Sequence, residues 1–223
     1  MGNRKVILGA PRLTLGLENM AKKDLSKELQ SLYFPGSKEP VTVKVPKMRF
    51  LMVDGKGDPN TSTDYREAIG ALYSVAYTAK FTLKKKAKEK DFGVMPLESL
   101  WWSEDEEDFL KMRKGNWCWR AMIMVPKQVT DDVVKDAIEQ LHKRGKDLPA
   151  LKKLKLKEFD EGLSVQIMHV GPYSAERPTI ERLRMFIRES GHKLYGKHHE
   201  IYLSDPGRTK PEKLKTVVRE PMR

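Results

Sequence analysis

The segment 199–203 (HEIYL) places a carboxylate and a phenol where they could do chemistry together. In a strand alternate side chains share a face, so Ile201 and Leu203 predict the buried face and Glu200 and Tyr202 share the other. The carboxylate could attract a cation or orient a water molecule, and the phenol could donate a hydrogen bond to a developing oxyanion. The alternative is an exposed edge strand with an ordinary solvated glutamate and tyrosine.

A group of tryptophans on two other predicted strands adds aromatic surface. All four tryptophans of the chain lie between positions 101 and 119. Trp117 and Trp119 alternate onto one face, where core packing explains them. Trp101 and Trp102 are adjacent and point to opposite faces, so one core cannot hold both. One of this pair is expected to face a cleft, and the pattern leaves open which.

An internal repeat relates these strands to each other. Residues 102–104 (WSE) align with residues 203–205 (LSD), which places Trp101 at the position of Tyr202 and Ser99 at that of Glu200. Two halves related by an approximate two-fold axis would therefore bring Trp101, Tyr202 and Glu200 to one cleft.

The elements that must position these residues follow the order β-α-β-β twice. Alternation and helical spacing predict strands at 48–54, 93–102 and 117–125 around a helix at 62–81. A helix at 131–143 and a basic connection follow. Strands at 164–170, 199–203 and 214–219 around a helix at 176–189 then repeat the order.

The predicted fold class is α+β, with duplicated βαββ half-domains and pseudo-two-fold symmetry. An antiparallel sheet is expected to carry helices on one side and a ligand groove on the other. Residues 1–20 are expected to be a leader or an expression remnant. Residues 21–223 are expected to form one domain, with halves at about 47–126 and 162–220.

Composition and charge leave one rival class of function. The formal net charge of +12 favours a phosphate-rich partner, so a basic nucleic-acid-binding protein is the alternative. Acidic and aliphatic residues interrupt the basic runs at 80–90 and 143–157, which is typical of solvated faces. No stretch is long and apolar enough for a membrane span, and a single cysteine, Cys118, fits a cytoplasmic protein.

Five segments together resemble one known family. They are FLMVDGKGDPN, YREAIGALYSVAYTAKF, MPLESLWW, VQIMHVGPYSAE and HHEIYLSDPGRTKPEKLKTVVREP. Over about residues 25–223 the chain resembles the GyrI-like small-molecule-binding family in its stand-alone form. The resemblance implies a βαββ pair around a ligand groove that binds diverse planar or cationic compounds, with a groove glutamate at Glu200. One similar branch hydrolyses cyclopropane-bearing DNA-alkylating natural products in an aromatic cage. Because the resemblance is to the stand-alone form, the DNA-binding domain of the regulator members is not expected.

The predicted function is binding of planar, aromatic or cationic xenobiotics in an aromatic-lined groove, with hydrolysis of cyclopropane-bearing compounds as a further possibility. The candidate catalytic residues are Glu200 and Tyr202, and the candidate ligand-binding residues are Trp101, Trp102, Trp119, Tyr73 and Tyr173. The expected partner is a small-molecule ligand, and no cofactor or metal is expected. His198 and His199 are adjacent and point apart, which makes a poor metal pair. The sequence predicts no particular oligomeric state.

Overall fold

A computed structural model describes residues 27–86, 92–105 and 113–223, and the predicted leader at 1–20 lies outside them. The strands are β1 (Val41–Val45), β2 (Met48–Lys56), β3 (Leu97–Trp102), β4 (Cys118–Met124), β5 (Lys155–Phe159), β6 (Gly162–Val170), β7 (His198–Tyr202) and β8 (Lys215–Pro221). The α-helices are α2 (Lys27–Tyr33), α3 (Thr63–Lys86), α5 (Asp131–Lys143) and α6 (Arg177–Glu189).

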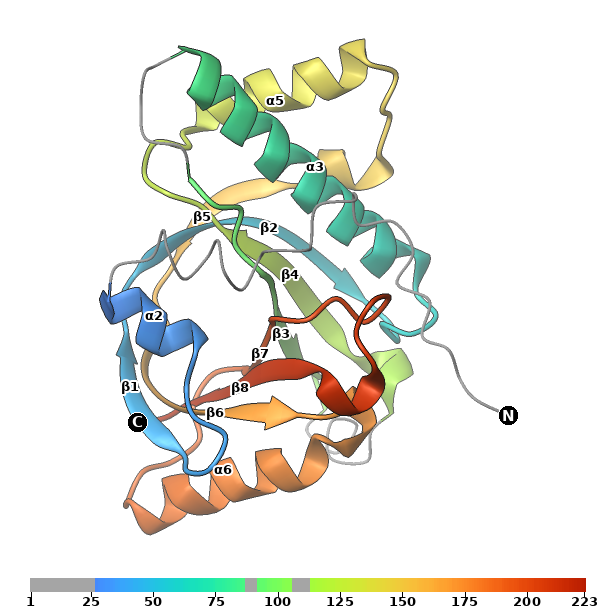
Figure 1. Ribbon diagram of the computed structural model, residues 1–223. Coiled ribbons are helices and arrows are strands. Elements are labelled where there is room, and N and C mark those ends of the chain that lie inside the picture. The colour runs from blue at the N-terminus through green and yellow to red at the C-terminus, as the bar shows by residue number, and fades with distance from the viewer. Residues whose placement is uncertain (1–26, 87–91, 106–112) are drawn as a thin grey trace.

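The eight strands form one antiparallel, curled sheet in the order β1-β6-β8-β7-β3-β4-β2-β5 (Figure 1). The units β2-α3-β3-β4 and β6-α6-β7-β8 confirm the predicted repeat of β-α-β-β. The central pair β3 and β7 joins the two units, with Ser99 opposite Glu200 and Trp101 opposite His198. The strands that carry the predicted chemistry are therefore neighbours at the junction of the halves.

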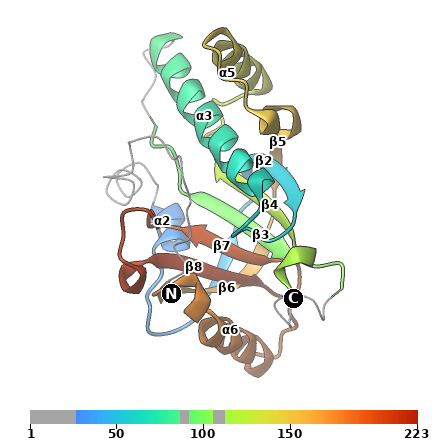
Figure 2. The same cartoon turned by 90° about the vertical axis from the view of Figure 1, so that its right-hand side faces the viewer.

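The helix α3 has a side-chain hydrogen bond near each of its ends. The hydroxyl of Ser62 accepts a hydrogen bond from the backbone N–H of Tyr65 at 3.2 Å, which caps the first turn. Near the other end, Gln140 of α5 donates to the buried hydroxyl of Thr82 at 2.9 Å. This contact lies beyond the predicted end of the helix at residue 81, in a part of α3 that packs against α5 (Figure 2).

The two faces of the sheet are covered by different helices. α3 packs on β2 and β4, and α6 packs on β6 and β8, where Val165 and Ile167 meet Leu183 and Ile187. The alternation along paired strands places both contacts on one face of the sheet. α2 covers part of the opposite face, because the Tyr33 hydroxyl donates to Glu98.

A buried ionic network fixes this opposite face. His199 lies between two carboxylates, with Nδ1 2.9 Å from Glu161 and Nε2 3.0 Å from Glu98. Arg219 contacts Glu161 at 2.9 Å, and its other terminal nitrogen donates to the backbone carbonyl of Leu32 in α2 at 2.7 Å. Each of the four charged side chains is at most 1% exposed, so their charges are matched inside the fold.

The strand β5 was missing from the predicted elements, where its residues formed part of the basic connection. It pairs with β2 as an edge strand, with Phe50 opposite Lys157. Lysines on an exposed edge oppose further strand pairing, so their presence agrees with this position. Leu154 and Leu156 alternate with lysines and pack against the core, but this alternation covers only two apolar positions inside a lysine-rich run, which explains why the sequence pattern did not reveal the strand.

Candidate functional site

Two hydrogen bonds join the three residues that the repeat predicted to converge. The indole Nε1–H of Trp101 donates to the Tyr202 hydroxyl at 3.1 Å, and that hydroxyl donates to Glu200 Oε2 at 2.7 Å. The register of β3 and β7 causes this arrangement, since alternate side chains of both strands project from the same face. The chain of donors from Trp101 to Glu200 is called the Trp101–Tyr202–Glu200 cluster below.

Aromatic rings from α3 and from the residue just before β4 contact Trp101. The ring centroid of Tyr65 lies 5.3 Å from that of Trp101 and 5.0 Å from that of Trp119, and the Trp117 centroid lies 5.9 Å from Trp101. These separations are typical of favourable tilted and edge-to-face pairs. The Tyr65 hydroxyl also lies 2.8 Å from the hydroxyl of Ser99. Trp101 is therefore held rigidly, with its N–H directed at Tyr202.

Another aromatic contact to the cluster comes from the turn that precedes α6. Tyr173 opens the short 3-10 helix Tyr173–Ala175, and its ring meets Tyr202 edge-on at 5.6 Å. Burial and the charge of Glu200 raise the pKa of Tyr202 well above its ordinary value, and the same two causes raise that of Tyr173. Both phenols therefore keep their protons and can act as hydrogen-bond donors near neutral pH.

The cluster lies on the face of the sheet that α3 and α6 cover, whereas the sequence predicted a groove on the face opposite to the helices. Tyr65 of α3 contacts the cluster from one side. Tyr173, in the 3-10 turn shortly before α6, contacts the cluster from the other side. Tyr202 and Tyr173 are partly exposed, and 13% of the Glu200 side chain is exposed. The carboxylate is thus mostly desolvated but not sealed.

Three predicted ligand-binding residues lie elsewhere. Trp102 projects from the opposite face, where Lys197 Nζ lies 3.3 Å from the centre of its ring. The structure thus makes Trp101 the member of the adjacent pair that faces the cluster. Tyr73 is buried farther along α3 and stacks on Tyr77, with centroids 6.3 Å apart.

Trp119 lies behind Tyr65 rather than at the exposed side of the cluster. It is 1% exposed and lines a small pocket of about 110 Å³ together with Val53, Asp64, Glu67, Pro149, Ala150 and Lys153. Its indole N–H has no hydrogen-bond partner among the described residues. This pocket includes neither Glu200 nor Tyr202.

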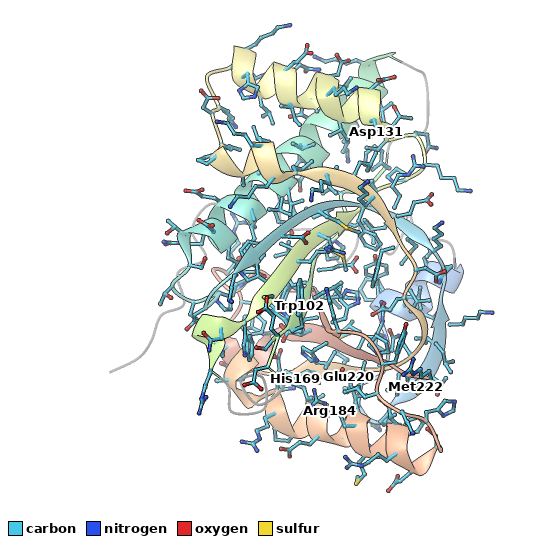
Figure 3. The ribbon with its side chains drawn as sticks, turned by 180° about the vertical axis from the view of Figure 1, so that it is seen from behind. Trp102, Asp131, His169, Arg184, Glu220 and Met222 are labelled. Atoms are coloured by element: carbon cyan, nitrogen blue, oxygen red, sulfur yellow. The ribbon has the colours of Figure 1, made fainter. Side chains whose placement is uncertain are left out.

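His198 is a central member of the site. From the sequence it was weighed only as a possible metal ligand. Its Nε2 lies 3.2 Å from Glu200 Oε1, and its Nδ1 lies 3.0 Å from Glu220 Oε1. Arg184 of α6 contacts the same oxygen of Glu220 at 3.4 Å, and Figure 3 shows these two residues beside α6. Positions 198, 200 and 202 alternate along one strand, so this pattern could have placed His198 on the same face.

The described residues contain no group of three or more side chains suited to hold a metal ion. The adjacent histidines do point apart, since His198 contacts Glu200 and Glu220 while His199 contacts Glu98 and Glu161. None of the helices in the described part of the chain has the length and apolar character that a membrane crossing requires.

Comparison with known proteins connects this geometry with a family. The sequence model of a protein family, the GyrI-like small molecule binding domain, matches residues 38–222 of this chain. An uncharacterized conserved protein from Listeria innocua is 38% identical, with a TM-score of 0.80 over 88% of this chain and 98% of its own. A protein from the same organism, described as a hydrolase, is 37% identical, with a TM-score of 0.77 over the same shares.

The C-terminal domain of EcmrR is 10% identical, with a TM-score of 0.51 over 83% of this chain and 97% of its own. At this identity the similarity shows the fold alone. Among curated proteins none matches the chain significantly.

Proposed function

Since the chain belongs to the GyrI-like small-molecule-binding family, we propose that it binds flat aromatic small molecules, xenobiotics among them, at the Trp101–Tyr202–Glu200 cluster. The observation that carries the proposal is the pair of hydrogen bonds that joins a rigid indole, a phenol and a mostly desolvated carboxylate at the junction of the two halves. Tyr173 and Tyr202 are the partly exposed rings that a flat ligand would contact first.

The physical basis of such binding is stacking combined with few polar contacts. A planar ligand gains dispersion and hydrophobic free energy against Tyr202 and Tyr173, whose edge-to-face arrangement leaves ring faces for a further partner. Glu200 then orients polar groups of the ligand, because a carboxylate with little exposure interacts with them more strongly than one in water does.

Hydrolysis of cyclopropane-bearing compounds is the second candidate function. It is favoured by the 37% identical Listeria innocua protein described as a hydrolase, and by the carboxylate and phenol that lie 2.7 Å apart. In this reaction a water oxygen would bond to a ring carbon while the bond from that carbon to the ring carbon conjugated with a carbonyl group breaks. The electron pair of the broken bond would move to the carbonyl oxygen. Glu200 would take the proton from water, and that proton would later reach the oxyanion.

Glu200→Gln tests the proposal, because it preserves shape and removes the charge. We expect this variant to bind the cation N-methylacridinium more weakly by about 1–3 kcal/mol, which is the scale of one charge-assisted contact. The affinity for uncharged acridine should change much less. Quenching of tryptophan emission measures both affinities. Turnover of a cyclopropane-bearing ligand, where wild type shows it, should fall further than binding, because a base acts mainly in the transition state.

The exposed Glu189→Gln at the end of α6 is the matched control and should leave both affinities unchanged. If Glu200→Gln binds both acridines as wild type does and turns over the third ligand at the same rate, Glu200 is not part of the site.

A further inference from the structure

The side chain of His198 is placed to carry a permanent positive charge. It is 3% exposed, and each of its ring nitrogens faces a carboxylate oxygen, Glu200 Oε1 at 3.2 Å and Glu220 Oε1 at 3.0 Å. An ionised carboxylate only accepts hydrogen bonds, so both nitrogens must donate, and an imidazole with two donors is an imidazolium. Burial alone would lower the pKa of His198, but Glu220 and Glu200 outweigh it and raise this pKa to about 10.

Within the part of the chain that the structure describes, the four ionic side chains joined by these contacts balance each other. Glu200 and Glu220 contribute two negative charges, and His198 and Arg184 contribute two positive charges. The imidazolium occupies one oxygen of Glu200, and the Tyr202 hydroxyl donates to the other. A positively charged ligand that approaches Glu200 therefore meets a carboxylate whose charge is already matched, and His198 repels it.

We propose that His198 is the internal counter-ion of Glu200 and a specificity-determining residue that makes the site prefer uncharged flat ligands to cationic ones. This inference rests on the proposed function and names the ligand class of the same site. Glu220 is a positioning residue, because it pairs with the imidazolium of His198, and Arg184 in turn contacts Glu220.

The ratio of two dissociation constants measures this preference. Acridine, at mildly alkaline pH where it is uncharged, and N-methylacridinium have nearly the same shape and differ in charge. Wild type is expected to bind acridine more tightly. His198→Gln keeps a hydrogen-bonding side chain and removes the positive charge, so it should shift the ratio toward the cation by roughly tenfold.

Glu220→Gln provides the opposite change, because it removes a negative charge and keeps the imidazolium on Glu200. It should shift the ratio further toward acridine. His192→Gln replaces a partly exposed histidine whose hydrogen bonds run to Ser190, and it should leave the ratio unchanged. Thermal unfolding of each variant shows whether it is folded, and if His198→Gln does not fold, Glu220→Gln decides the question alone.

A purely structural His198 would change stability and leave the ratio of the two affinities unmoved. If the folded variants bind acridine and N-methylacridinium with the same ratio of affinities as wild type, the inference is wrong and the proposed function still stands. A wild type that prefers N-methylacridinium would also overturn it. If wild type binds neither compound, the proposed function fails and the inference fails with it.

Discussion

Glu161 is the residue whose charge is most strongly tied to the fold. Burial alone would raise its pKa, but His199 and Arg219 outweigh this effect and lower the pKa from 4.5 to about 2. A carboxyl with a lowered pKa in the folded state contributes stability that is present above its unfolded pKa. That stability is lost as the pH falls through the folded value, so the window lies between about pH 4.5 and pH 2.

We predict that wild type loses about 2–3 kcal/mol more free energy of unfolding across this window than Glu161→Gln does. Urea unfolding at a series of pH values measures the difference. Glu158→Gln is the control, since Glu158 is half exposed and pairs with Lys47 at the surface, so its slope should stay close to that of wild type. Equal slopes for wild type and Glu161→Gln would show that the network does not hold this carboxylate ionised.

For single residues, the sequence was a better guide to the face of the sheet on which each side chain lies than to the side chains that it contacts. Alternation placed Glu200 and Tyr202 together and left the choice between Trp101 and Trp102 open, because two adjacent residues always point apart. The ion pair of His198 with Glu220 depends on the register between β7 and β8, which are consecutive in the chain but joined by a long connection, so the chain order suggests their pairing and not which residues lie opposite each other. A local sequence pattern therefore does not tell which residues lie opposite each other on paired strands.

Trp119 is fixed by the backbone of the neighbouring strand, and this contact can be tested at the scale of elements. Gly55 of β2 lies opposite Trp119 of β4, and a Cβ at Gly55 would overlap the six-membered ring of that indole. We expect Gly55→Ala to destabilise the protein by about 1–3 kcal/mol through overpacking, and to loosen Tyr65 and Trp101 beyond it.

Gly70→Ala is the matched control for this prediction, because Gly70 lies inside α3 with no heavy atom near the added methyl group. It should stabilise the protein by up to about 1 kcal/mol, since alanine favours a helix more than glycine does. Chemical unfolding measures both variants. A Gly55→Ala protein as stable as wild type would show that Trp119 can move without cost.

The elements themselves were predictable where an apolar pattern repeats. The buried positions Tyr65, Ile69, Leu72 and Ala76 recur at helical spacing and predicted α3, although not its last turn beyond residue 81. That turn depends on Gln140 of α5, a tertiary contact that no local pattern contains. β5 was missed for a different reason, since its alternation rests on Leu154 and Leu156 alone within a lysine-rich run.

At the scale of the whole molecule, the net charge of +12 raises the question of nucleic acid. Several basic side chains are engaged by acids at the surface, such as Lys47 with Glu158 and Lys153 with Asp64. We predict that duplex DNA binds weakly at physiological salt, as measured by fluorescence anisotropy with a labelled oligonucleotide. Tight binding with a steep loss as salt rises would instead favour the nucleic-acid alternative.

The most direct test of the proposed site is a crystal structure of the protein with acridine bound. We predict that the flat ligand lies against Tyr202 and Tyr173, within contact distance of Glu200, and that the hydrogen bonds from Trp101 to Glu200 persist. Acridine found only in the pocket beside Trp119 and Lys153, or only on the surface, would contradict the assignment of the Trp101–Tyr202–Glu200 cluster as the ligand site.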